Sequence, residues 1–201
     1  MTTKQRILQQ AITSYNENGL MNVTSRSLAS DLGISHGNLE YHFPNKEALI
    51  KAIYKQMRKE ISGIYKLEDE AVNPFVRFNN LLLELEHFNI KYSFFNLDVL
   101  EISRNYPEVN KLLKQTFLIR SEQEALFYRR FKECNYFKDE TVPGMYKRLQ
   151  HTVRILITFW NSQQSVLPKQ DTSVSMSVYI WELLVPHMTD AGLAAYYDLK
   201  K

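Results

Sequence analysis

The sequence predicts an all-α protein in which a small amino-terminal domain, residues 1–48, precedes a larger helical domain, residues 49–201. Apolar residues recur at three- and four-residue intervals along most of the chain, which is the spacing of one helix face. No stretch alternates apolar and polar residues as a half-buried strand does. Glycine, proline and hydroxyl-bearing residues stand where the helical stretches begin and end, and they mark the boundaries of each element.

The first helix is predicted from about Lys4 to Asn18. Gly19 ends it, because glycine takes the left-handed conformation of a helix end without a steric penalty. An apolar stripe follows one side of this helix, formed by Ile7, Leu8, Ala11, Ile12 and Tyr15. We expect the stripe to cover the two short helices that follow.

Two short helical patterns come next, Ser25–Leu32 and Ser35–His42, and only Gly33 and Ile34 separate them. Thr24 or Ser25 can cap the first helix with a side-chain oxygen, and Ser35 can cap the second. Two short helices joined by so tight a turn form a helix-turn-helix, the unit that places its second helix in the major groove of DNA.

The second of these helices is expected to turn polar residues outward. At about 100° per residue, Gly37 and Tyr41 lie nearly opposite the inward-facing Leu39, with Asn38 and Glu40 on the flanks. Glycine permits close approach to DNA, and asparagine can bond adenine through two hydrogen bonds. Hydroxyl and imidazole groups can reach phosphate oxygens, so this outer face suits the major groove.

Pro44 ends the second short helix, and Asn45 can cap a longer helix that begins at Lys46. The lysine and the free backbone N–H groups collect at this helix start, which attracts a phosphate. The long helix begins in the amino-terminal domain and ends beyond it. It is therefore placed to transmit movement from the larger domain to the DNA-reading one.

This region resembles the DNA-binding domain of the TetR family of bacterial transcription regulators. The resemblance covers roughly the first sixty residues and rests on a spaced set across three helices: Thr24, Leu28-Ala29, Gly33-Ile34-Ser35, Gly37, Leu39, Tyr41-His42-Phe43-Pro44, Lys46 and Leu49. By position, it implies that Thr24, Tyr41, His42 and Lys46 contact phosphates, with Ser25 beside them. It implies that His36, Gly37 and Asn38 approach the bases.

Glu40 departs from this family pattern, which usually has tyrosine at the same position. A carboxylate there would repel a phosphate. Glu40 therefore either accepts a hydrogen bond from a cytosine amino group or points away from the DNA.

The charge distribution agrees with a DNA-binding amino terminus. Residues 1–62 hold eight Lys or Arg and five Asp or Glu, whereas the remaining 139 residues hold 17 of each. The whole formal excess of +3 thus lies on the segment with the helix-turn-helix, as expected if that segment meets a polyanion. An excess of this size can also arise by chance, so the asymmetry alone decides little.

The larger domain is predicted to be helical throughout. An acidic segment, Leu67–Pro74, loosens the pattern at its start, and a loop is expected over Pro168–Thr172. The expected helices are Pro74–Lys91, Ser93–Arg104, Pro107–Glu133, Gly144–Ser165, Ser173–His187 and a short terminal helix capped by Thr189 or Asp190.

Two stretches of this domain, Val153–Trp160 and Val178–Val185, are apolar around most of the helix circumference and need burial on two sides. Packing their outer faces on a second subunit would give a four-helix interface. The alternative is that both are central core helices of a monomer. We expect a homodimer, because a helix-turn-helix usually needs two half-sites, and the family resemblance points the same way.

Of the 25 aromatic residues, 21 lie beyond residue 62. They can line an apolar cavity, as ligand sites usually are, or simply fill a solid core. The resemblance favours a cavity, since TetR-like regulators commonly bind a small effector in this part of the chain. The expected lining residues are Phe78, Phe88, Phe95, Phe117, Phe127 and Trp160.

The sequence offers little for catalysis, cofactors or metals. Glu84 and His87 form an E-x-x-H pair, but a di-iron site needs a second such pair and the chain has none. No glycine-framed serine or phosphate-binding glycine loop is present, and the single cysteine, Cys134, has no partner for a disulfide or a zinc site. We expect no enzyme activity and no cofactor.

No apolar run reaches the length of a transmembrane helix or of a signal-peptide core, so a cytoplasmic protein is expected. The resemblance implies a transcription regulator, in most cases a repressor, that binds a palindromic operator as a homodimer and is released by a small, largely apolar effector. The alternative is a constitutive DNA-binding regulator without an effector.

Overall fold

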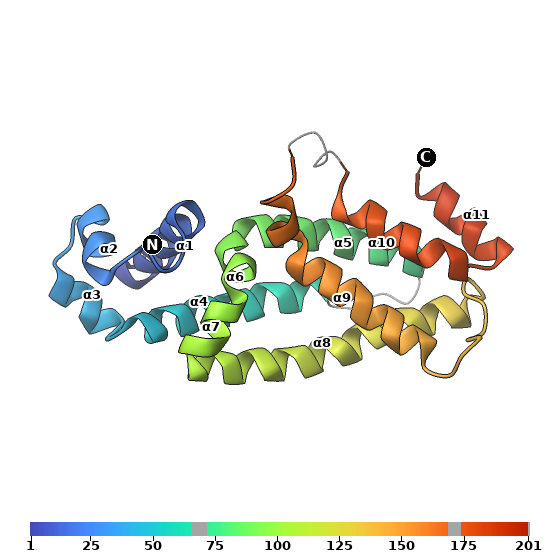
Figure 1. The fold of residues 1–201 in the computed structure, drawn as a ribbon, viewed down its shortest axis with the longest axis horizontal. Coiled ribbons are helices and arrows are strands. Elements are labelled where there is room, and N and C mark those ends of the chain that lie inside the picture. Colours follow the sequence, from blue (N-terminus) through green and yellow to red (C-terminus); the bar gives the residue numbers. More distant parts are fainter. Residues whose placement is uncertain (66–71, 169–173, 201) are drawn as a thin grey trace. The chain divides into compact units, whose positions relative to one another are not determined.

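The computed structural model describes residues 1–65, 72–168 and 174–200 (Figure 1). Within these ranges the regular elements are helices, and one isolated β-bridge pairs Phe137 with Met188. The predicted all-α class is confirmed. The helices of the described ranges lack the combination of length and apolarity that crossing a lipid bilayer requires.

Packing divides the chain into two compact units. Unit 1 consists of Met1–Ser62 and Lys91–Thr116, and unit 2 consists of Gly63–Ile90 and Phe117–Lys201. Three helices contribute residues to both units: α4, α8 and, through its last residue Lys91, α5. The functional division after residue 48 stays a prediction, because it concerns the roles of the segments and not their packing.

Unit 1 begins with the predicted helix-turn-helix. Its helices are α1 (Thr3–Asn18), α2 (Ser25–Asp31), α3 (His36–His42), most of α4 (Lys46–Ile64), α6 (Ser93–Leu97), α7 (Val99–Asn105) and the start of α8 (Pro107–Glu133). Thr24 caps α2, Ser35 caps α3 and Asn45 caps α4, as the sequence predicts. Gly33 takes a left-handed φ of 64°, which lets the chain turn sharply between α2 and α3.

The core of unit 1 is built by the apolar stripe of the first helix, of which only Leu8 stays half-buried. Leu28 of α2 and Leu39 of α3 are each 1% exposed. Their burial fixes which sides of the two short helices face outward, because each helix buries only one face.

One predicted element differs. The single helix expected over Ser93–Arg104 is two helices, α6 and α7, which meet at Asp98. Asp98 has a non-helical backbone, and its carboxylate accepts a hydrogen bond of 3.1 Å from the Leu20 N–H. The prediction of one helix was wrong because no glycine or proline marks the break, which accompanies a contact with a distant turn.

Unit 2 contains α5 (Pro74–Lys91, of which Lys91 belongs to unit 1), the longer part of α8, α9 (Met145–Gln164), α10 (Met176–Leu184), the 3-10 turn η2 (Val185–His187) and α11 (Asp190–Asp198). The predicted loop after Pro168 and the start at Ser173 lie outside the described residues, as does most of the Leu67–Pro74 segment. Thr189 caps α11, as predicted.

Aromatic rings form the centre of unit 2. Phe75 lies 4.9 Å from Phe131 and 5.0 Å from Trp181 between ring centroids, with edge-on geometry in both pairs. Phe78 lies 5.4 Å from Phe127 and the same distance from Trp181. The rings thus join α5, α8 and α10 in one packed core.

Helix α11 approaches the segment after α8 very closely. The Thr189 N–H donates to the Tyr136 carbonyl at 2.9 Å, and a Cβ built on Gly192 would stand 2.1 Å from the same oxygen. Only glycine therefore fits at position 192 without a shift of the helix.

We predict that Gly192→Ala lowers the free energy of unfolding by about 1–3 kcal/mol, because the added methyl group forces α11 away. Gly63→Ala is the matched control. A Cβ at this helical position meets nothing within 4 Å, so the change should raise the free energy by about 0.5–1 kcal/mol. Chemical denaturation of both variants checks the pair, and a tolerated Gly192→Ala would contradict the close packing.

Candidate DNA-binding surface and effector cavities

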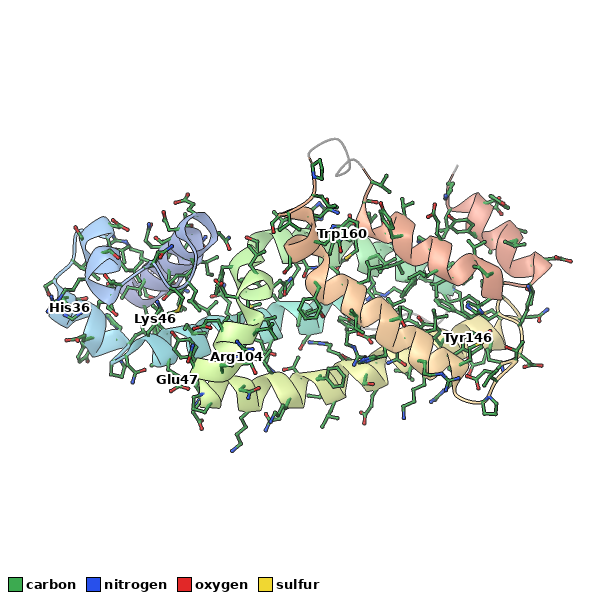
Figure 2. The ribbon with its side chains drawn as sticks, in the orientation of Figure 1. His36, Lys46, Glu47, Arg104, Tyr146 and Trp160 are labelled. Carbon is green, nitrogen blue, oxygen red and sulfur yellow. The ribbon has the colours of Figure 1, made fainter. Side chains whose placement is uncertain are left out.

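Helix α3 carries five of the residues predicted to meet DNA, and Figure 2 labels the first of them, His36. Leu39 and Phe43 are buried on the inner side of this helix, while Tyr41 on the opposite side is 84% exposed. Gly37 and Asn38 are also exposed, and a Cβ on Gly37 would meet no atom within 4 Å. The surface around Gly37 is therefore open to an approaching backbone.

The flanks of α3 carry two histidines and one carboxylate. His36 and His42 are half-buried, and His36 Nδ1 lies 3.6 Å from the Glu40 carboxylate one turn later. The ring of His42 lies edge-on to that of Tyr41, with centroids 5.3 Å apart. The predicted contact residues of α3 thus lie on the outer face and the flanks of one short helix.

Thr24 and Ser25 stand at the start of α2. The exposed Thr24 hydroxyl accepts a hydrogen bond of 3.0 Å from the Ser27 N–H, and Ser27 Oγ accepts one of the same length from the Thr24 N–H. Ser25 is half-buried as the first residue of the helix. The Thr24 hydroxyl is fixed by this capping box and remains accessible to a phosphate.

Lys46, which the resemblance assigns to a phosphate contact, also has partners within the protein. Its ammonium group donates to the Leu20 carbonyl and, at 2.9 Å, to the Val23 carbonyl, and it lies 5.7 Å from the Tyr15 ring centroid. Burial lowers the pKa of the ammonium, while the nearby charge of Asp98 acts in the opposite direction. An ammonium has three hydrogens, so one remains for a phosphate and two hold the turn between α1 and α2.

Hydrogen bonds also link the helix-turn-helix to α6 and α7. The Asn16 side chain donates to the Lys91 carbonyl at 2.9 Å and accepts from the Phe94 N–H at 3.0 Å, which ties the end of α1 to the start of α6. The Leu20 N–H bonds Asp98 where α6 and α7 meet. Sequence reasoning missed these contacts, since the partners lie more than seventy positions apart.

A third link joins α4 to α8. The Glu47 carboxylate accepts a hydrogen bond of 3.0 Å from the Glu108 N–H at the start of α8. The Glu108 carboxylate in turn pairs with Lys51 at 2.9 Å, and this hydrogen bond and charge lower the pKa of Glu108. Both partners of the pair are exposed enough for water to screen it, so the link orients the helices more than it stabilises them.

The six aromatic residues predicted to line one effector cavity do not come together in the described parts of the chain. Phe78 and Phe127 are in contact within the core of unit 2. Phe95 belongs to unit 1, where it stacks on Tyr54 with centroids 5.0 Å apart. Two cavities in unit 2 nevertheless include members of the predicted set, and each has its own chemistry.

The first cavity has a volume of only about 10 Å³ and is called the closed cavity below, because it has no room for a ligand. Phe78 is its only member of the predicted set among the described lining residues, which are Tyr65, Phe78, Leu81, Leu82, Leu85, Glu124, Tyr128, Gln150, Val153 and Ile157. Apolar side chains of α5 and α9 face a polar wall centred on Glu124. This carboxylate accepts hydrogen bonds from Tyr65 Oη at 3.1 Å and from Arg154 Nε at 3.0 Å.

Tyr128 contributes an unusual group to the closed cavity. Its side chain is 6% exposed, and its buried hydroxyl has no hydrogen-bond partner among the residues that the structure describes. Burial, followed by the charge of Glu124, raises the pKa of this hydroxyl, so it stays a protonated donor. The cavity is at the lower limit of what one water occupies. The arrangement therefore leaves a buried donor available to a molecule that opens the site.

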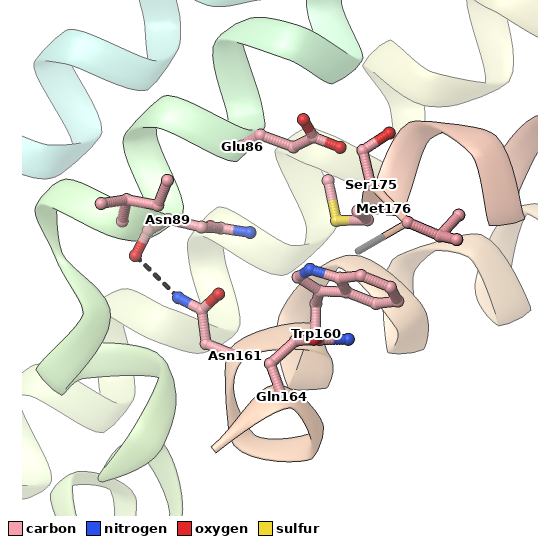
Figure 3. A pocket seen from close by; sticks show the side chains of 9 residues that line it. Glu86, Asn89, Trp160, Asn161, Gln164, Ser175 and Met176 are labelled. Atoms are coloured by element: carbon pink, nitrogen blue, oxygen red, sulfur yellow. Dashed lines mark hydrogen bonds between the residues drawn. The ribbon is translucent and has the colours of Figure 1, made fainter. Parts of the chain in front are cut away.

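The second cavity has a volume of about 340 Å³ (Figure 3). Trp160, Asn161 and Gln164 of α9 face Glu86 and Asn89 of α5 across it. Much of its polar lining already has a structural role. The Asn161 amide donates to the Asn89 carbonyl at 2.8 Å, and Glu86 accepts from the Ser177 N–H at 2.8 Å.

The other predicted lining residues, Phe88 and Phe117, line neither of these two cavities. Phe88 is half-buried on α5, and Phe117 is 45% exposed beneath the Arg154 guanidinium, 4.4 Å from its ring centroid. Arg154 is a charged residue inside the apolar Val153–Trp160 stretch, and this exception could have predicted the polar wall around Glu124 in the closed cavity. Within the described ranges, no three His, Cys, Asp or Glu side chains gather as a metal site.

An exposed second helix on a helix-turn-helix, joined to a larger helical body, defines a class of DNA-binding transcription regulators. Comparison with known families agrees. Residues 7–53 match the family described as "Bacterial regulatory proteins, tetR family", and residues 56–196 match the one described as "Bacterial transcriptional repressor". The chain belongs to the TetR family of transcriptional regulators, which confirms the resemblance seen in the sequence.

Individual relatives are distant. The transcriptional regulator UidR of Escherichia coli K12 is 25% identical over 147 residues, which cover 73% of this chain and 75% of UidR. A TetR-family regulator from Marinobacter aquaeolei VT8 has a TM-score of 0.86 at 21% identity and covers 94% of this chain and 93% of its own. A protein from Saccharomonospora viridis, solved in complex with choline, has a TM-score of 0.74 at 19% identity, covering 92% and 96%. The two structures support the fold alone.

Proposed function

We propose that this TetR-family regulator is a homodimeric repressor that binds a palindromic operator and is released by a small, largely apolar molecule. Residues 1–48 would read the DNA, and residues 49–201 would bind the effector and form the dimer. The protein would act in the cytoplasm, beside the chromosome, by binding and not by catalysis. The observation that carries the proposal is the open outer face of α3 above the buried Leu39 and Phe43.

In the proposed complex, α3 lies in the major groove of DNA. His36, Gly37 and Asn38 are at the amino-terminal end of the helix, where base edges are read, and Asn38 suits adenine. Tyr41, His42, Thr24 and Ser25 would contact the phosphates on either side of the groove. The positive excess of the first 62 residues supports this orientation, because DNA attracts the more basic part of the chain.

The proposed dimer rests on apolar side chains that α9 and α10 leave uncovered. Each helix buries one face, with Val153 of α9 and Ile180 of α10 at 5% and 0% exposure. Each also exposes a second apolar face, where Ile155, Phe159, Tyr179 and Leu183 are 37–48% exposed. Four such helices, two from each subunit, would cover these faces. The two helix-turn-helix units would then stand at a fixed spacing that matches two half-sites of the operator.

The proposed effector site is the closed cavity with Tyr128. A largely apolar molecule carrying one acceptor oxygen would satisfy the buried hydroxyl, while its body would contact the leucines of α5. It can enter only if the cavity expands, so binding must move α5, α8 or α9. Helix α8 continues from Tyr128 to Glu108, which bonds α4 near the reading helix. Effector and DNA would then weaken each other's binding by the same factor.

The alternative is a constitutive regulator without an effector. One observation favours it: the closed cavity of about 10 Å³ is small enough to be an ordinary packing defect. The open cavity of about 340 Å³ offers a second place for an effector, and the similar protein from Saccharomonospora viridis was solved in complex with choline. Ligand-binding experiments decide whether an effector binds in the closed cavity, binds in the open cavity or does not exist.

For DNA reading, we predict different effects of Asn38→Ala and Lys46→Ala. Loss of Asn38 should reduce discrimination at particular bases by about 1–3 kcal/mol. Loss of Lys46 should weaken binding to all sequences and reduce the salt slope by about one phosphate, provided that its third hydrogen bonds DNA. Fluorescence anisotropy with a selected operator and a random duplex measures both.

Lys46→Ala should also lower the melting temperature, since its ammonium holds the α1–α2 turn. A lower melting temperature with an unchanged salt slope would assign Lys46 to the turn alone. Equal effects of the two variants on specific and random DNA would refute the proposed division of roles.

For the dimer, we predict that Phe159→Glu converts the protein to a monomer and abolishes tight operator binding, because it places a charge in the proposed four-helix interface. Leu118→Glu is the matched control, since Leu118 is 64% exposed on α8, outside the α9 and α10 faces. Light scattering coupled to size exclusion gives the oligomeric state. A Phe159→Glu variant that remains a dimer would exclude this interface.

For the effector site, we predict that Tyr128→Phe does not lower the stability of the free protein but does lower the stability that a bound effector adds. The buried hydroxyl has no hydrogen-bond partner in the described part of the chain, so its removal should leave the free protein as stable or more stable. The same change should reduce the stabilisation that any effector gives. A thermal-shift screen of metabolites on the wild type supplies the ligands, and Trp160→Phe in the open cavity is the control.

A ligand whose effect is lost in Trp160→Phe and kept in Tyr128→Phe would move the proposed site to the open cavity. If no compound stabilises the wild type while operator binding is intact, the constitutive alternative holds.

A further inference from the structure

We infer that Glu40 is a specificity-determining residue whose carboxylate accepts a hydrogen bond from the amino group of a cytosine in the operator. This inference rests on the proposed binding of DNA through α3. It assigns a chemical role to the one acidic residue on the outer surface of that helix, and it names the base that the residue selects.

The position of Glu40 on α3 gives the first part of the argument. It stands between the buried Leu39 and the 84% exposed Tyr41, and its own side chain is 52% exposed. At about 100° per residue, Glu40 lies within 40° of His36, one turn earlier, so the two share a flank of the helix. The 3.6 Å between His36 Nδ1 and the Glu40 carboxylate confirms that the side chains lie together.

That flank leads toward the end of the helix that reads bases. In a helix-turn-helix the amino-terminal residues of the second helix contact base edges, and His36 is the first residue of α3. The Glu40 side chain reaches back toward this end, as helical side chains generally do. Its carboxylate is therefore directed at the base edges more than at the phosphates beside the carboxyl-terminal end.

The chemistry of the groove decides what an exposed carboxylate can bind there. An ionised carboxylate only accepts hydrogen bonds, and phosphate oxygens repel it. The major groove offers two base donors, the amino groups of cytosine and adenine. The adenine amino group has the acceptor N7 beside it, which faces a second carboxylate oxygen unfavourably. Cytosine presents its amino group without that neighbouring acceptor, so it is the base that Glu40 selects.

The test compares the operators selected by three proteins from a random duplex library: the wild type, Glu40→Gln and Glu40→Ala. The wild type should select cytosine at one position of each half-site. Glu40→Gln should shift that same position to adenine, because an amide supplies both a donor and an acceptor for the adenine edge. Glu40→Ala should lose the preference at that position, by roughly 5- to 150-fold in relative affinity, and keep the others.

Glu17→Gln is the matched control, since it removes the same charge from an exposed position on α1 and leaves α3 unchanged. It should leave every base preference unchanged. Unchanged preferences in both Glu40 variants, with equal gains in affinity for all sequences, would overturn the inference, because Glu40 would then only repel phosphates. Failure of the wild type to select any sequence would instead overturn the proposed DNA binding, and this inference with it.

Discussion

The backbone of Leu20 is held at both its N–H and its carbonyl, and the position of the helix-turn-helix depends on these two hydrogen bonds. Its N–H bonds the Asp98 carboxylate where α6 meets α7, and its carbonyl accepts from the Lys46 ammonium at the start of α4. The turn between α1 and α2 is thereby fixed to two other parts of unit 1. Because these groups are partly buried, each hydrogen bond is stronger than it would be in water, and losing one would leave a polar group unsatisfied.

Helices α5 and α8 connect the proposed effector site with the predicted DNA-reading domain. Helix α8 carries Tyr128 and Glu124 of the closed cavity and, nearer its start, Glu108, which bonds Glu47 of α4. Helix α5 supplies leucines to the same cavity and ends at Lys91, whose carbonyl is bonded by Asn16 of α1. Two of the helices that line this cavity are therefore hydrogen-bonded, at their other ends, to residues of the predicted DNA-reading domain. The contacts are a candidate pathway, and coupling between them is what the effector proposal asserts.

Most features of α3 could be predicted from the sequence, because they depend on interactions between residues close together in the chain. Ser35 caps α3, Leu39 and Phe43 form its inner face, and Gly33 makes the preceding turn, all through interactions within a few residues. The outcome for Lys46 was different. Its place at a helix start was predicted correctly, yet its ammonium turns to carbonyls more than twenty positions earlier, which no local pattern encodes. For the same reason the break at Asp98 was missed.

By itself the sequence determined the helical class, the family, most helix boundaries and the face of α3 that is turned outward, since periodicity, caps and turns act over short distances along the chain. Only the tertiary structure decided which aromatic residues share a core and which line a cavity. Phe78, Phe95 and Phe117 look alike in the sequence but lie in a core, in the other unit and at the surface. Side-chain environments depend on the contacts between distant helices, and helical spacing alone carries no record of them.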